Sequence, residues 1–168
     1  NKIRNAFCPQ DKENYVMLSA DYSQIELRLL AHIAGDEHLI EAFNNDVDIH
    51  TLTASKVFGV PIEEVTKDMR RKAKAVNFGI VYGISDWGLS EQLDISVGES
   101  KKIITNFYEA YPEIRDYLNG LVDFAKDNGY AKTMFERRRY LPEINSSQYQ
   151  LREFAKRAAM NAPIQGSA

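Results

Sequence analysis

The chain has 168 residues, of which 44% are hydrophobic and 27% are charged, and its formal net charge is −3. This length allows one domain of ordinary size or a large part of a bigger one, and the apolar share is sufficient for a core. The sequence has no apolar run near the roughly 20 residues of a membrane span, no signal-peptide pattern and only one cysteine, Cys8, which excludes an internal disulfide.

A hairpin is predicted at the start of the chain, where residues 3–8 and 15–20 pair across a polar turn. Helices are then predicted over residues 23–34, 36–43, 49–58, 67–82, 85–93, 96–110, 112–127 and 146–160, with a small strand pair within residues 130–140. The fold is therefore predicted to be α+β and mostly helical.

The turn after the second predicted strand carries two carboxylates. Asp21 lies at the carboxyl end of the strand, which is a usual place for a metal-binding carboxylate, although an ordinary turn aspartate fits as well. Ser23 fits an N-cap, and Glu26 three residues later completes a capping box. From the residues alone, Glu26 therefore also has a purely structural interpretation.

The helix predicted over residues 67–82 carries two stripes. Thr66 fits its N-cap and places Arg70 and Lys74 near the positive end of the helix dipole. Because a step of four residues departs from a full turn by only about 40°, Arg70, Lys74 and Phe78 project from nearly one face. This face suits a nucleoside triphosphate; the alternative is a solvated basic face with a core aromatic. The separate apolar stripe consists of Met69, Ala73, Val76 and Ile80.

Net charge alone does not indicate a nucleic-acid-binding protein, but affinity for phosphates depends on local charge. Two basic clusters supply such charge. One is Arg70, Arg71, Lys72 and Lys74, and the other is the arginine triplet at residues 137–139.

The strongest signal is a set of ordered motifs. Residues 21–28, Asp-Tyr-Ser-Gln-Ile-Glu-Leu-Arg, and residues 70–83, Arg-Arg-x-x-Lys-x-x-Asn-Phe-Gly-x-x-Tyr-Gly, resemble motifs A and B of family A DNA polymerases. Residues 48–51, Asp-Ile-His-Thr, lie between them as the family would place them, and residues 161–168 resemble the segment shortly before motif C. The resemblance covers essentially the whole chain.

The resemblance implies a partial polymerase palm sheet with a helical fingers subdomain. Residues 1–35 would belong to the palm, residues 36–147 to the fingers, and residues 148–168 to a helix that returns to the palm. The His-Asp-Glu motif C, which supplies the second catalytic aspartate of the family, does not occur in the sequence. We therefore expect an internal piece of a polymerase that is inactive alone.

The implied reaction adds deoxynucleotides to a primer 3′-hydroxyl, with two Mg²⁺ ions in the complete enzyme. Asp21 corresponds to the motif A metal ligand, joined by the main-chain carbonyl of Tyr22, and Lys74 is the candidate general acid for the pyrophosphate leaving group. The implied partners are primer–template DNA and deoxynucleoside triphosphates, without a membrane. We expect the complete enzyme to be an intracellular monomer, either at the nucleoid in a bacterial cytoplasm or encoded by a virus.

Three residues have particular implied roles toward the nucleotide. Glu26 would occupy the space that a ribose 2′-hydroxyl needs, Tyr82 would stack at the templating position, and Phe78 in place of tyrosine suggests discrimination against dideoxynucleotides. The implied nucleotide-binding set is Tyr22, Ser23, Gln24, Ile25, Glu26, His50, Arg70, Lys74, Phe78 and Tyr82. The implied contacts to primer–template DNA are Tyr82, Arg157, Asn161 and Gln165.

Alternatives remain for the protein and for single residues. A phage-type single-subunit RNA polymerase shares the palm and the motif A aspartate, but Glu26 argues against ribonucleotides. A non-catalytic nucleic-acid-binding module would not need Asp21. His50 corresponds to a phosphate-contacting histidine, but it also fits a structural histidine or a metal site with Asp46 and Asp48.

One residue departs from the family pattern. Family members often have glycine before the arginine triplet, whereas this chain has Glu136. If that turn needs a positive φ, we expect backbone strain at Glu136.

Overall fold

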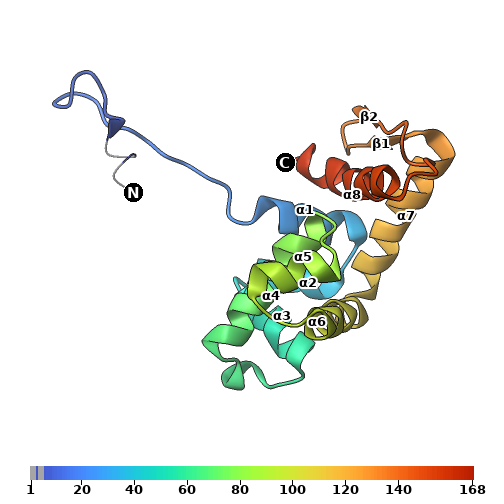
Figure 1. Cartoon of the computed structure of the whole chain (residues 1–168). Coiled ribbons are helices and arrows are strands. Elements are labelled where there is room, and N and C mark those ends of the chain that lie inside the picture. The colour runs from blue at the N-terminus through green and yellow to red at the C-terminus, as the bar shows by residue number, and fades with distance from the viewer. Residues whose placement is uncertain (1–2, 4–5) are drawn as a thin grey trace.

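The computed structural model describes residue 3 and residues 6–168. Residues 6–24 form an arm that extends away from a helical body (Figure 1). Across the described part of the chain, no helix combines the length and the apolarity that a membrane crossing needs.

The body consists of helices and one two-stranded antiparallel sheet, as the predicted fold class requires. The strands pair with Tyr130 opposite Tyr140 and Lys132 opposite Arg138. In chain order the elements are α1 (Ile25–Ala34), α2 (Glu37–Asn44), α3 (Ile49–Phe58), the short 3₁₀ helix η2 (Ile62–Glu64), α4 (Lys67–Val81), α5 (Asp86–Leu93), α6 (Val97–Ala110), α7 (Pro112–Asn128), β1 (Tyr130–Lys132), β2 (Arg138–Tyr140) and α8 (Tyr149–Gln165).

Local capping explains why most helix starts agree with prediction. The side chains of Asp36, Thr66, Ser85 and Ser96 each accept a hydrogen bond from a backbone N–H in the first turn of α2, α4, α5 and α6. Each cap is a polar residue directly before an amphipathic segment, so it was visible in the sequence.

The predicted N-terminal hairpin is wrong over its described residues. The first strand falls partly on residues outside the description, and residues 15–20 form no strand. The polar turn does form, because the Asp11 carboxylate accepts hydrogen bonds from Glu13 and Asn14. Val16 and Leu18 are each 89% exposed, so pairing there would bury too little apolar surface to offset the loss of chain entropy.

The predicted capping box at α1 is also wrong. The N-cap is Gln24, which has a left-handed backbone with φ 53° and makes no capping hydrogen bond. The main-chain carbonyl of Ser23 accepts a bond from Arg28 Nε at 3.0 Å, and Glu26 accepts one from Tyr82. Of the groups that the box would have used, the Glu26 carboxylate is therefore engaged by another residue.

The last helix is longer than predicted. It continues past Met160 and through Pro163 to Gln165. Proline lacks the N–H that would bond back along the helix, but Pro163 and Ile164 are both buried. Tertiary packing therefore outweighs the local cost of proline.

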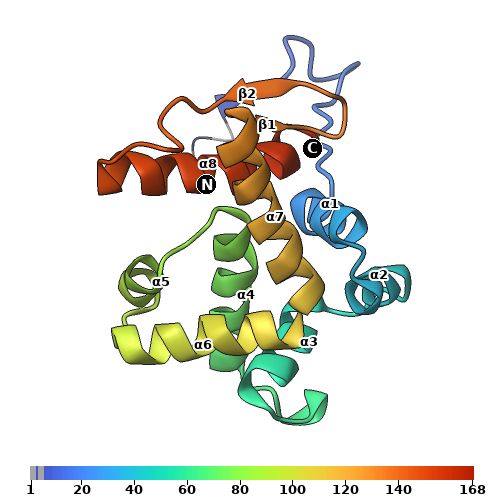
Figure 2. The same cartoon turned by 90° about the vertical axis from the view of Figure 1, so that its right-hand side faces the viewer.

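Two hydrophobic cores hold the body together. The larger one joins α1–α7 with Ile164 of α8 and includes Leu30 and Val76, while the smaller one gathers alanines of α7, β1 and α8 with Leu141 and Ile144. In Figure 2, α7 runs from the α6 end of the body to the hairpin and α8. Helix α7 thus contributes to both cores and sets the position of α8 relative to α4.

Candidate nucleotide and nucleic-acid site

The two predicted stripes of α4 are separated as the spacing requires. Ala73, Val76 and Ile80 are each no more than 1% exposed, and Val76 and Ile80 belong to the larger core. Met69, the first residue of the predicted stripe, is half-buried. Arg70 and Lys74 are exposed, and Phe78 is half-buried. The two cations of this face therefore lie at the surface, while the apolar stripe anchors the helix.

Helix α3 places His50 beside this face of α4. The imidazole centroid lies 5.9 Å from the ring centroid of Phe78, and His50 is only 4% exposed. Burial lowers the pKa of His50; the Asp48 charge opposes this shift, and the charges of Arg70 and Lys74 add to it. The ring is therefore held neutral between two cations.

Asp48 links the start of α3 to α4. One carboxylate oxygen accepts from His50 N at 3.0 Å, and the other accepts from Arg70 Nε at 2.7 Å. Burial raises the pKa of Asp48, but the hydrogen bonds from Arg70 and Thr51 outweigh it and lower that pKa to about 2. This engagement orients Arg70 and leaves no free Asp48 carboxylate for a metal site with Asp46 and His50.

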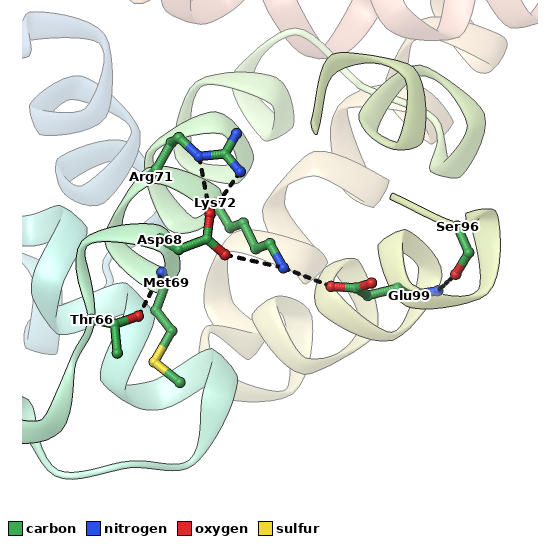
Figure 3. A network of polar contacts seen from close by, with 7 residues as sticks. All are labelled: Thr66, Asp68, Met69, Arg71, Lys72, Ser96 and Glu99. Carbon is green, nitrogen blue, oxygen red and sulfur yellow. Dashed lines mark hydrogen bonds and ion pairs between the residues drawn. The ribbon is translucent and has the colours of Figure 1, made fainter. Parts of the chain in front are cut away.

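The rest of the first basic cluster splits into different roles. Arg71 donates two hydrogen bonds to Asp68, and Lys72 bridges Asp68 at 3.4 Å and Glu99 of α6 at 2.8 Å (Figure 3). These pairs tie α4 to itself and to α6. Lys74 has no ion pair within residues 6–168, so it remains available to an anion.

A side-chain hydrogen bond joins the end of α4 to α1. Tyr82 donates a hydrogen bond from its hydroxyl to Glu26 Oε1 at 2.9 Å. This bond to Glu26, with some burial, raises the pKa of Tyr82. The two motifs predicted from sequence therefore touch through their two expected nucleotide-facing residues.

Asp21 and Tyr22 lie in the exposed arm just before α1. Ser23 and Gln24 line an open pocket of about 260 Å³ together with Arg28 and Arg70. The structure thus brings the motif A turn to Arg70. No three His, Cys, Asp or Glu side chains gather into a metal-binding group among the residues described here, so Asp21 stands as a single carboxylate.

Three of the predicted DNA-contacting residues, Arg157, Asn161 and Gln165, lie along α8, and the fourth, Tyr82, follows the end of α4. Asn161 Nδ2 lies 3.5 Å from the carbonyl of Val81 at the end of α4. Arg157 packs against Gly83, and Gln165 lines a pocket of about 230 Å³ with the arginine triplet. The helix therefore runs from the end of α4 to the second basic cluster.

The turn before the arginine triplet does require a positive φ at Glu136. Glu136 adopts a left-handed backbone with φ 64°, and its carboxylate pairs with Lys132 Nζ at 2.7 Å. The hairpin therefore forms despite the strain, and the ion pair within it partly neutralises the added negative charge.

Sequence reasoning missed the polar residues that support His50. Asn77, Thr53 and Tyr111 are each no more than 3% exposed and are joined by hydrogen bonds. The one local signal was Asn77, a polar residue directly beside the apolar stripe of α4. Its partners are 24 or more positions away and gave no signal.

Comparison with known proteins decides the family. The sequence model of DNA polymerase family A matches residues 1–168. The chain belongs to DNA polymerase family A. This membership confirms the resemblance seen in motifs A and B and disfavours the phage-type RNA polymerase alternative.

Several family members are close in sequence and structure. The chain is 55% identical to DNA polymerase I of Caldicellulosiruptor bescii over 166 residues and 56% identical to that of Bacillus subtilis over 167 residues. Each match covers 99% of this chain and 19% of the relative, so the chain spans about a fifth of their length. The POL domain of Pol1 from M. smegmatis, solved in complex with a DNA primer-template and dNTP, has a TM-score of 0.80 and 52% identity, covering 88% of this chain and 26% of that one.

Proposed function

We propose that this chain is the nucleotide-binding part of a DNA-directed DNA polymerase. The observation that carries the proposal is that the exposed Arg70 and Lys74 of α4 lie beside the half-buried Phe78 and the buried His50 of α3. The M. smegmatis relative is bound to primer-template DNA and dNTP, which supports the same two partners here. The complete enzyme would join a deoxynucleotide to a primer 3′-hydroxyl.

The triphosphate would bind across α3 and α4. Arg70 presents a planar guanidinium that can grip phosphate oxygens at two points, and Asp48 holds that group in place. Lys74 adds a compact charge one turn further along the helix. The neutral imidazole of His50 would donate a hydrogen bond to the same phosphates. Phosphate binding would therefore not require a positively charged His50.

The leaving group needs a proton donor and charge neutralisation. Lys74 is exposed and has no ion pair within the described chain, so its ammonium can approach the departing pyrophosphate. We propose Lys74 as the general acid that protonates pyrophosphate as the bond to the α-phosphate breaks.

Asp21 and Tyr22 would hold Mg²⁺ at the motif A turn. A carboxylate and a main-chain carbonyl are the hard oxygen ligands that this ion prefers, so the donor types fit. When bound, a pair of such ions neutralises phosphate charge and lowers the pKa of the attacking hydroxyl. A second carboxylate is needed for the pair, and we propose that it comes from another part of the polymerase.

The sugar and base would be read by the contact between α1 and α4. Tyr82 holds the Glu26 carboxylate, so that Glu26 can block a ribose 2′-hydroxyl without swinging away. Phe78 would pack on the sugar and base, and Tyr82 would stack at the templating position. We propose that the turn through Ser23, Gln24 and Ile25 contacts the phosphates from the opposite side.

The primer–template would lie along α8. Arg157, Asn161 and Gln165 are spaced four apart on this helix and lead from Gly83 to the arginine triplet. We propose the division of residues 1–35 and 148–168 to the palm and 36–147 to the fingers, in an enzyme that acts as an intracellular monomer.

A chimera tests the function. Residues 1–168 would replace the matching segment of Bacillus subtilis DNA polymerase I, which is 56% identical. We expect template-directed extension with Mg²⁺ and deoxynucleotides, and loss of about a hundredfold or more of that rate with Asp21→Asn. Asp127→Asn, an exposed carboxylate on α7, should extend primers normally.

The alternative is a non-catalytic module that only binds nucleic acid. In that case the chimera would bind primer–template but not extend it. Asp21→Asn would then leave binding unchanged or tighten it, because a negative charge near phosphate is removed.

A further inference from the structure

A chain of three buried polar side chains lies behind His50. Tyr111 at the α6–α7 junction is 0% exposed, Thr53 of α3 is 0% exposed and Asn77 of α4 is 3% exposed. The Tyr111 hydroxyl lies 3.3 Å from Thr53 Oγ1, Thr53 Oγ1 lies 3.1 Å from Asn77 Oδ1, and Asn77 Nδ2 lies 3.0 Å from His50 Nδ1. Helices α3 and α4 and the α6–α7 junction therefore contribute to one hydrogen-bonded series that ends on the histidine.

Counting protons fixes the direction of this series. If Tyr111 donates to Thr53, Thr53 donates to Asn77 Oδ1 and the Asn77 amide donates to His50 Nδ1, every buried hydroxyl proton has an acceptor. If the Asn77 amide is turned over, its nitrogen faces Thr53, and only one of the two hydroxyl protons finds an acceptor in the series. Leaving a buried donor unpaired is unfavourable, so the first arrangement is preferred.

The preferred direction determines the tautomer of His50. Because Nδ1 accepts a hydrogen bond, the proton of the neutral ring resides on Nε2. Nε2 has no hydrogen-bond partner in the described chain, and the buried unpartnered side-chain atoms there are Gln24 Oε1 and Asp36 Oδ2. Nε2 therefore reaches solvent, on a histidine whose near charges are those of Asp48, Arg70 and Lys74.

We propose that Tyr111, Thr53 and Asn77 are positioning residues that hold His50 as the Nε2–H tautomer, ready to donate to a phosphate oxygen. The opposite tautomer would present a lone pair to that oxygen and repel it. The role toward phosphate rests on the proposed polymerase function. The tautomer itself does not, because it follows from the buried series alone.

Nitrogen NMR of this chain tests the tautomer directly. The sequence has three histidines, and a His50→Gln variant assigns the His50 signals in a sample with ¹⁵N-labelled imidazoles. At neutral pH we expect an unprotonated Nδ1 and a protonated Nε2. A His50 ring that carries its proton mainly on Nδ1 would overturn the proposal.

Substitutions at Thr53 test the positioning role. Thr53→Val keeps the shape but removes the hydroxyl, so we expect both His50 tautomers to appear in the NMR spectrum. In the chimera we expect the KM for deoxynucleotide to rise about two- to tenfold with little change in kcat, as for one lost hydrogen bond. Thr53→Ser should restore both readouts, and Thr105→Val, an exposed site on α6, should change neither.

The outcomes separate the two proposals. A chimera that cannot extend primers counts against the polymerase function, while the NMR result still decides the tautomer. An active chimera in which Thr53→Val alters neither the tautomer nor the KM overturns the positioning role alone.

Discussion

At the scale of single residues, neighbours in one basic cluster have different roles. Arg70 is oriented by Asp48, and Lys72 is bound to Asp68 and Glu99. Lys74 has no such partner within residues 6–168. Charge in the sequence therefore indicates a cationic helix face, but the position of nearby carboxylates decides which cation is free of an ion pair.

The Tyr82–Glu26 hydrogen bond leads to a prediction on sugar selectivity. In the chimera, Glu26→Ala should raise ribonucleotide incorporation because the side chain that fills the 2′-hydroxyl space is removed. Tyr82→Phe keeps the aromatic ring and the carboxylate but removes the bond that holds Glu26, so it should raise incorporation by a smaller factor. Primer extension with ribonucleotides and deoxynucleotides in competition measures both effects, and unchanged selectivity in Glu26→Ala would refute the gate.

At the scale of secondary structure, Asp48 both caps α3 and ties it to α4. Its folded pKa is about 2, below the ordinary value of 3.8. A depressed pKa means that the ionised group stabilises the folded chain above about pH 4, and that this contribution is lost as the pH falls toward 2.

We therefore expect the wild type to lose more free energy of unfolding between about pH 4 and pH 2 than an Asp48→Asn variant does. The Asp48 side chain is 43% exposed, so solvent screening keeps the difference modest. Urea denaturation at several pH values measures it, and Asp127→Asn should follow the wild-type profile. If the free energy of unfolding of wild type and Asp48→Asn changed in parallel with pH, the stabilising role of ionised Asp48 would be contradicted.

The junction between α4 and α8 depends on a glycine. Gly83 has a left-handed backbone with φ 65°, and an added Cβ would lie 2.6 Å from Met160 Cε and 3.0 Å from Arg157 Cγ. Gly35 has a similar φ of 71° but open space around the same position. The two sites therefore share the backbone strain and differ in the steric contact.

Alanine at Gly35 should destabilise the fold by about 1–2 kcal/mol, the cost of a left-handed alanine. Gly83→Ala should cost more, because Met160 and Arg157 must also move. Urea denaturation of the two variants gives the comparison directly. Equal losses of free energy of unfolding in the two variants would mean that Met160 and Arg157 of α8 move aside without a measurable cost.

At the scale of the whole molecule, a compact body carries an exposed arm. The arm presents apolar side chains such as Val16 and Leu18 to solvent, whereas the helices of the body share two cores joined by α7. Among the described residues, brief trypsin digestion should therefore cut first after Lys12 and leave residues 13–168 intact, as mass spectrometry of the fragments would show. An initial cut within α1–α8 would show that the body opens more readily than its packing indicates.

The sequence by itself determined the family, most helix boundaries and the cationic face of α4. Caps such as Thr66 and stripes such as Arg70 and Lys74 depend on residues within a few positions, so local physics sets them. Motifs A and B are likewise local patterns, and they sufficed to indicate the family.

Only the tertiary structure decided how the candidate site is held. The bond between Tyr82 and Glu26 and the bond between Tyr111 and Thr53 span 56 and 58 positions, and no local pattern encodes them. Contacts between distant residues also explain why the predicted capping box is absent at α1 and why α8 continues through Pro163. Burial and hydrogen bonding between distant segments outweigh local preferences of about 1 kcal/mol per group, which is why these features appear only when the helices pack.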